Sequence, residues 1–146
     1  MTAGALASVI SRAPNAGDFF LGSVVVYSDE MKQSALNVDS DLLETFGGVS
    51  AEVTAALIRG LQTHFPMADL LVAITGFAFE CPATTAENPV GTVFIHIQLE
   101  RIRYTKRYVL EGDENAIINR SIDLVLNLIG EITEHFVKGV QSKENG

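Results

Sequence analysis

Apolar residues in this chain form short unbroken runs, alternating stretches and helically spaced stripes. Residues 19–27 are apolar at nearly every position, which predicts a strand buried on both faces. Residues 70–74 form a second apolar run bounded by polar residues, as in a central strand. Residues 92–99 alternate apolar and polar side chains, and we expect residues 101–110 to pair with them through a tight turn near Glu100.

Stripes of apolar residues predict the helices that cover these strands. Residues 2–11 have apolar side chains on one side, and residues 12–17 have a loop composition. Ser50 is expected to cap a helix with apolar residues at four-residue intervals, which Pro66 ends. A last helix opens after Gly112, and its stripe consists of Ile118, Ile122, Val125, Ile129, Ile132 and Phe136.

Strands interleaved with helices, with one adjacent strand pair near the end, predict an α/β fold. We expect a three-layer α/β/α sandwich with a mixed sheet. At 146 residues the chain has the length of one ordinary domain, so residues 1–146 are interpreted as a single domain with a core of its own.

The charge balance limits the classes of partner. Ten Lys and Arg face eighteen Asp and Glu, which gives a net charge of −8 and argues against binding to nucleic acid or to an anionic membrane. The densest basic run is interpreted as the solvated side of a strand; it comprises Arg101, Arg103, Lys106 and Arg107. The sequence contains neither an apolar run of bilayer length nor a signal-peptide pattern, so we expect a soluble cytoplasmic protein.

Cysteine and histidine usage gives no sign of a metal or a cofactor. Cys81 stands alone, which excludes an intramolecular disulfide, and no Cys/His cluster has zinc spacing. His64, His96 and His135 are far apart, and we assign them no chemistry. The positive mean hydropathy of +0.25 favours some apolar surface in a homo-oligomer interface.

Lys32 is the first candidate for chemistry, because it lies one helical turn after the predicted strand 19–27. Ser28 or Asp29 would cap the short helix that carries it. A lysine acts as a general base only where desolvation or a nearby cation favours its neutral form. Taken alone, Lys32 would more often be an exposed helix lysine.

Further candidates lie at strand ends, where α/β proteins bind ligands. Tyr27 would border a pocket or simply pack, and Ser28 would bind a ligand or only cap a helix. Thr75 would hydrogen-bond a substrate or the lysine, and Gly76 would allow close approach of the backbone; both also fit a plain strand-to-loop turn.

Two more candidates would contact an anion. The backbone amides of Thr2, Ala3 and Gly4 begin the first helix, where unpaired N–H groups attract an oxyanion or a phosphate, although a frayed terminus is the alternative. Arg120 would reach a substrate phosphate across an interface, or it is an ordinary surface arginine.

The segment from Tyr27 to Lys32, Tyr-Ser-Asp-Glu-Met-Lys, resembles the Tyr-Ser-Asn-Glu-Ala-Lys signature of the CinA C-terminal domain family, the nicotinamide mononucleotide amidohydrolases. The likeness continues in order along almost the whole chain. Phe-Gly-Gly-Val-Ser at residues 46–50 is similar to the family's His-Gly-Ala-Val-Ser, and Pro-Val-Gly-Thr-Val at residues 89–93 repeats a family element. The opening, residues 1–7, resembles Ser-Cys-Thr-Gly-Gly-Leu-x-Ala, entered one residue late.

The resemblance implies hydrolysis of nicotinamide mononucleotide to nicotinate mononucleotide and ammonia, with a serine nucleophile and a lysine base. It implies that Lys32 and Tyr27 are catalytic. The residues implied to bind the nucleotide substrate are Thr2, Ala3, Gly4, Ser28, Thr75, Gly76 and Arg120. The family's serine would precede Met1, so we expect the chain to lack the N-terminal strand and the nucleophile, and to be impaired as an enzyme. The alternative is a non-catalytic module that binds a nucleotide or a partner protein.

Residues 77–82, Phe-Ala-Phe-Glu-Cys-Pro, depart from the family's glycine-rich Ile-Ala-Gly-Pro-Gly-Gly loop. Glycines let backbone amides approach a phosphate closely. Here the loop is bulkier, Glu80 adds a negative charge, and Asn88 stands where the family has a lysine. We therefore expect weaker phosphate binding than in relatives with the glycine loop.

Overall fold

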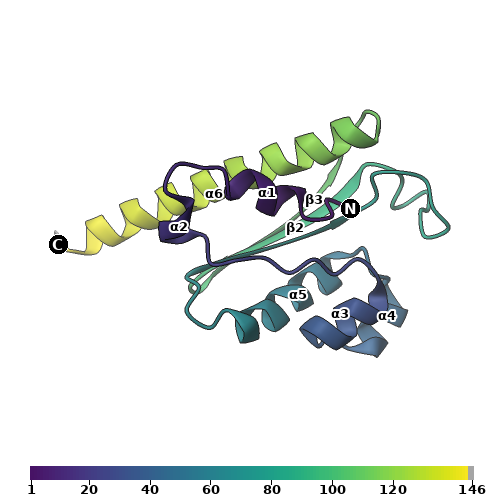
Figure 1. Cartoon of the computed structure of the whole chain (residues 1–146), viewed down its shortest axis with the longest axis horizontal. Helices are drawn as coiled ribbons and strands as arrows, with labels where there is room; N and C mark the ends of the chain where they lie inside the picture. Colours follow the sequence, from purple (N-terminus) through teal and green to yellow (C-terminus); the bar gives the residue numbers. More distant parts are fainter. Residues whose placement is uncertain (145–146) are drawn as a thin grey trace.

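Three antiparallel strands form the sheet of this protein, which is described by a computed structural model of residues 1–144 (Figure 1). Strand β1 (Leu70–Gly76) pairs with β2 (Thr92–Leu99), and β2 pairs with β3 (Ile102–Val109). The β2–β3 turn contains Glu100 with a φ of +49°, which confirms the expected hairpin. Strand β2 pairs along both edges, and nearly all its residues are buried.

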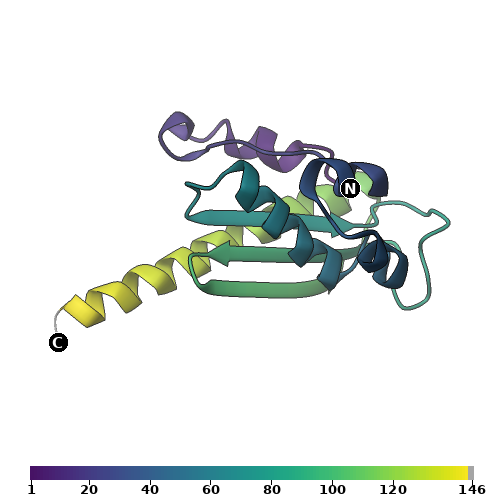
Figure 2. The same cartoon turned by 90° about the horizontal axis from the view of Figure 1, so that it is seen from below.

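Helices cover both faces of the sheet (Figures 1 and 2). One layer holds α3 (Asp29–Leu36), α4 (Ser40–Phe46) and α5 (Ala51–His64), and its core residues pack on Leu71 and Ala73 of β1. The opposite layer holds α1 (Ala5–Ile10) and the long α6 (Glu114–Glu144), with α2 (Ala16–Phe19) beyond α1. Val93, Ile95 and Ile97 of β2 pack against α6 on this side. The predicted α/β class and three-layer arrangement are thus confirmed.

Side-chain caps fix where the helices next to the candidate site begin. Ser28 Oγ accepts the N–H of Met31 at 3.3 Å to start α3, and Ser50 Oγ accepts the N–H of Val53 at 3.2 Å to start α5. Helix α4, which the apolar pattern did not predict, begins in the same way at Asp39. Each cap fixes the residue at which its helix begins.

Helices α3 and α5 approach each other closely through a glycine. A Cβ on Gly60 of α5 would lie 2.0 Å from the carbonyl oxygen of Leu36, so no larger residue fits there without moving α3. This contact anchors the C-terminal end of the helix that carries Lys32.

The prediction of a doubly buried strand at residues 19–27 is wrong. Phe19 ends α2, and residues 20–27 run as an extended segment outside the sheet. Val24 and Val26 pack on the core of the α5 layer, whereas Val25 is 53% exposed and Tyr27 is 62% exposed. One face of this segment is thus covered, and its backbone lacks the ladder partner that a strand requires.

Two related expectations also need correction. The described strands are all antiparallel rather than mixed, and residues 19–27 do not join the sheet. The first helix begins at Ala5 instead of Thr2, since Ala3 and Gly4 have φ angles of +46° and +91°. Within residues 1–144 no helix has the length and apolar character to cross a bilayer.

Candidate functional site

Lys32 is buried at the centre of the candidate site. Its residue is only 7% exposed, and Nζ donates to Oδ1 of Asp29 at 2.6 Å, one helical turn earlier in α3. The Asp29 side chain is 49% exposed, so the ion pair connects a buried ammonium to solvent. From the sequence, Asp29 is expected only as a possible helix cap, although the three-residue spacing to Lys32 is typical of a helical ion pair.

The loop before α5 closes over this ion pair. A Cβ added to Gly48 would lie 2.1 Å from Asp29 Oδ1 and 2.7 Å from Lys32 Nζ, so the glycine makes room for both groups. Ser50, two residues later, caps α5 and donates its hydroxyl to the carbonyl of Gly47. The segment resembling the family's His-Gly-Ala-Val-Ser therefore forms a wall of the site.

Met1 connects Lys32 to the end of β1. Burial lowers the pKa of the Met1 amino group, and the positive charge of Lys32 lowers it further. A Cβ on Gly76 would lie 2.7 Å from Sδ of Met1 and 2.6 Å from the carbonyl oxygen of Thr92. The absence of a side chain at Gly76 therefore leaves room for Met1 and for the carbonyl of Thr92, and the approach of a ligand to Gly76 stays a prediction.

The position of Met1 favours a particular register of the opening motif. Gly4 and Leu6 match Ser-Cys-Thr-Gly-Gly-Leu without a gap when the motif's serine is aligned with Met1 itself. The structure favours this register over one in which the serine precedes Met1, because residue 1 already lies beside Lys32. Methionine then stands where the family has its serine.

Thr75 belongs to a buried hydroxyl chain behind Gly76. Its Oγ1 lies 2.7 Å from Oγ1 of Thr54, which itself donates to the carbonyl of Ser50 at 2.5 Å. Thr54 has one hydroxyl proton, and that proton goes to Ser50, so Thr75 must donate to Thr54. Thr75 can therefore only accept a hydrogen bond from a ligand or from a lysine.

The other predicted residues make local contacts or are exposed. Ser28 caps α3, and Tyr27 is largely exposed on the extended segment. The carbonyl of Thr2 accepts the N–H of Ala5, and α1, at six residues, is short. Arg120 on α6 is exposed and donates to the carbonyl of Glu111, which fastens the turn before α6.

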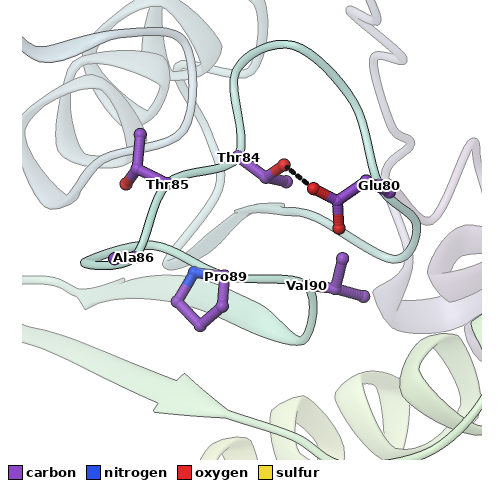
Figure 3. Close-up of a pocket in the computed structure, with 6 residues that line it drawn as sticks. All are labelled: Glu80, Thr84, Thr85, Ala86, Pro89 and Val90. Carbon is purple, nitrogen blue, oxygen red and sulfur yellow. Dashed lines mark hydrogen bonds between the residues drawn. The ribbon is translucent and has the colours of Figure 1, made fainter.

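The loop between β1 and β2 lines an open cavity of about 430 Å³ (Figure 3). Glu80 accepts a hydrogen bond from Thr84 Oγ1 at 2.9 Å, and Thr85, Ala86, Pro89 and Val90 form the rest of the wall. A carboxylate and threonine hydroxyls dominate its polar groups, so the cavity wall has no cation to receive a phosphate.

No metal centre is found among residues 1–144, which contain no cluster of three or more His, Cys, Asp or Glu side chains able to hold an ion. Cys81 is a free, partly buried thiol. The chemistry available at the site is therefore that of Lys32, Asp29, threonine hydroxyls and backbone groups.

Comparison with known proteins identifies the family. The family model described as the CinA C-terminal domain matches residues 1–133. A CinA-like protein of Thermotoga neapolitana is 41% identical over 125 residues, 86% of this chain and 30% of that protein, and one of Mycobacterium avium is 38% identical over 133 residues, 88% of this chain and again 30% of that protein. The chain thus spans about a third of the length of these relatives.

Solved structures give the same result. A competence damage-inducible protein A from Klebsiella pneumoniae has a TM-score of 0.84 at 26% identity, covering 92% of this chain and 82% of its own. A CinA superfamily protein from Escherichia coli has a TM-score of 0.82 at 26% identity, covering 90% and 75%. With the family model matched over most of its length, this chain belongs to the CinA C-terminal domain family.

Proposed function

We propose that residues 1–146 are a single domain of an amidohydrolase that converts nicotinamide mononucleotide and water to nicotinate mononucleotide and ammonia. A serine hydroxyl would attack the carboxamide carbon while Lys32 accepts its proton and passes it to the departing ammonia. Water would then release nicotinate mononucleotide from the serine. The reaction is a hydrolysis and calls for no cofactor.

The observation that carries this proposal is the position of Lys32. It is buried, and its ammonium lies beside residue 1 and the end of β1, where the opening motif has its serine. Thr75 would accept a hydrogen bond from the lysine or the substrate, and Gly76 would let the substrate approach the backbone. Tyr27, Ser28, Arg120 and the backbone of residues 2–4 remain proposed contacts of the nucleotide.

Methionine at position 1 limits what residues 1–146 do by themselves. A thioether cannot give up a proton and attack a carbonyl as a serine hydroxyl does. We therefore propose that this chain hydrolyses the amide slowly or not at all, while its pocket still accepts the nucleotide.

The second candidate is a non-catalytic module that binds a nucleotide or a partner protein. It is favoured by the ion pair, because within the described residues the hydrogen-bond acceptor for Lys32 Nζ is Asp29 rather than a hydroxyl. A lysine that removes a proton needs a free lone pair. An ammonium held by a carboxylate is instead suited to bind an anion or a carbonyl oxygen.

We further propose that the domain acts as a homo-oligomer in the cytoplasm. Exposed apolar side chains on the extended segment and its flank support an interface; they are Phe19, Leu21, Val25 and Tyr27. The lone thiol of Cys81 suits a reducing compartment.

Titration calorimetry with nicotinamide mononucleotide, together with an ammonia assay, tests this function on residues 1–146. We expect binding without appreciable turnover, and about tenfold weaker binding in Lys32→Ala, because a charged hydrogen bond is worth about 1.5 kcal/mol or more. Lys138→Ala is the matched control, since Lys138 forms a similar but exposed pair with Glu134 at 2.7 Å. Equal loss in both variants, or no binding at all, would reject the nucleotide pocket. Rapid ammonia release that depends on Lys32 would mean that another residue has become the nucleophile.

A further inference from the structure

His96 and Arg103 share the face of the sheet that α5 covers, and Arg59 of α5 acts on His96 through its charge. His96 on β2 pairs with Ala73 of β1 and with Thr105 of β3, so its side chain is on the face that α5 covers. Arg103 is two residues from Thr105 along β3 and shares this face. Arg59 of α5 lies close enough for its charge to act on His96.

The two arginines, Arg59 and Arg103, lack anionic partners in the part of the chain that the structure describes. Neither Arg59 nor Arg103 forms an ion pair or hydrogen bond through its guanidinium there, although acidic residues outnumber basic ones by eighteen to ten in the sequence. The other arginine on this face of β3, Arg107, is held by the carbonyl of Glu87 and the side chain of Asn88. Two guanidiniums whose charges both act on His96, and which have no carboxylate partner, make the surroundings of His96 positive in an acidic protein.

The hydrogen bond of His96 with Thr105 orients the imidazole ring. The residue is 6% exposed, and its Nδ1 lies 2.6 Å from Thr105 Oγ1. When the threonine hydroxyl donates to Nδ1, the neutral ring carries its proton on Nε2. No described side chain or backbone group bonds Nε2, so in that tautomer Nε2 can donate to a ligand.

We propose that Arg59, His96 and Arg103 form a binding site for a phosphate group, separate from the Lys32 site. A phosphate is favoured over a carboxylate because its oxygens can receive two guanidinium forks and an imidazole N–H together. The site is built from α5, β2 and β3, whereas the Lys32 site is built from α3, the loop before α5 and the end of β1.

The charge environment of His96 supports this assignment. Burial lowers the pKa of His96, and the positive charges of Arg103 and Arg59 lower it further. A bound phosphate would offset the two arginine charges, so it would act on the imidazole directly. The histidine therefore reports occupancy of the site.

The test is a phosphate titration of the full chain, followed by NMR of its three histidine rings at constant ionic strength. The probes are inorganic phosphate and, in a second arm, adenosine monophosphate. We expect saturable shifts of the His96 ring, with His64 and His135 as internal controls. Tighter binding of the monophosphate assigns the site to phosphomonoesters, and equal binding assigns it to free phosphate.

Variants distinguish a built site from general charge attraction. Arg59→Gln and Arg103→Gln should each weaken binding about tenfold. Arg12→Gln removes the same charge from the chain between α1 and α2, and it should leave binding unchanged. Circular dichroism checks that each variant is folded. The proposal is overturned if the His96 ring does not respond, or if all three arginine variants behave alike.

Discussion

Gly48→Ala is predicted to break the ion pair at the centre of the candidate site. The added Cβ would lie 2.1 Å from Asp29 Oδ1, whereas carbon and oxygen in ordinary contact are about 3.3 Å apart. The carboxylate must therefore retreat by about 1 Å. Asp29 is half exposed and Lys32 is not, so Asp29 should swing into water and leave the buried ammonium without its acceptor.

The expected loss of stability follows from two opposing effects. An unsatisfied buried polar group costs about 1–3 kcal/mol. Replacing glycine by alanine also restricts the unfolded chain, which returns about 0.4–1 kcal/mol. The net effect is a decrease of about 1–2 kcal/mol in the free energy of unfolding, measured by urea denaturation. Lys32 should also become more reactive toward an acylating reagent, as measured by peptide mass spectrometry.

Two comparisons isolate the ion pair from other effects of the substitution. Gly47→Ala adds a methyl group to open space at a φ of +75°, so it tests backbone strain alone. In an Asp29→Ala background the carboxylate is gone, and Gly48→Ala should cost less, because only the 2.7 Å contact of the added Cβ with Lys32 Nζ remains. The family motifs have asparagine and alanine at the positions of Asp29 and Gly48. The stability cost of Gly48→Ala should therefore also be smaller in an Asp29→Asn background. An unchanged cost in the Asp29→Ala background would refute this reasoning.

Three further predictions concern other parts of the molecule. Thr54→Val should destabilise the protein more than Thr75→Val, by about 1 kcal/mol in urea denaturation, because only Thr54→Val leaves the buried hydroxyl proton of Thr75 without an acceptor. The reverse order would overturn the assignment of this proton. The pKa of His96 is lowered from 6.5 in the folded state, so the unfolded chain binds the extra proton first and the free energy of unfolding should fall as the pH drops through about 6.5. This loss should be smaller in His96→Gln, and an equal loss would exclude His96 as its source. Glu80→Gly should strengthen nicotinamide mononucleotide binding in calorimetry by removing bulk and charge, whereas equal affinities would place the phosphate elsewhere, most directly at residues 2–4.

The sequence predicted the helices and strands whose apolar periodicity and capping residues match the way in which they pack in the fold. Alternation in residues 92–99 and the Ser50 cap before a four-residue stripe correctly predicted β2 and α5. The apolar run at residues 19–27 led to a wrong prediction of a strand, because such a run shows that a segment can be buried but not whether a partner strand is present. Helix α4 was missed because it is short and buries little; Leu43 is its one buried residue.

The candidate site was predicted only in part, because side-chain partners depend on how elements pack. Lys32 and Gly76 were singled out, and the structure connects them through Met1. The role of Asp29 as the partner of Lys32 and the role of Gly48 in covering the pair were missed. The first was readable from helical spacing, but the second required the position of the loop before α5 relative to α3.

Lys32 is proposed to take the proton of a serine hydroxyl at the position that Met1 occupies in this chain. The most direct measurement is nicotinamide mononucleotide turnover by a chain that carries Met1→Ser behind an added apolar strand, compared with the same chain carrying Lys32→Ala or, as a control, Lys138→Ala. We expect the chain with the serine to release ammonia and nicotinate mononucleotide. This release should remain in Lys138→Ala and disappear in Lys32→Ala. Circular dichroism should show that the Lys32→Ala chain is still folded. Turnover that persists in Lys32→Ala would contradict the account, and so would the absence of turnover in a folded chain that carries both the serine and the lysine.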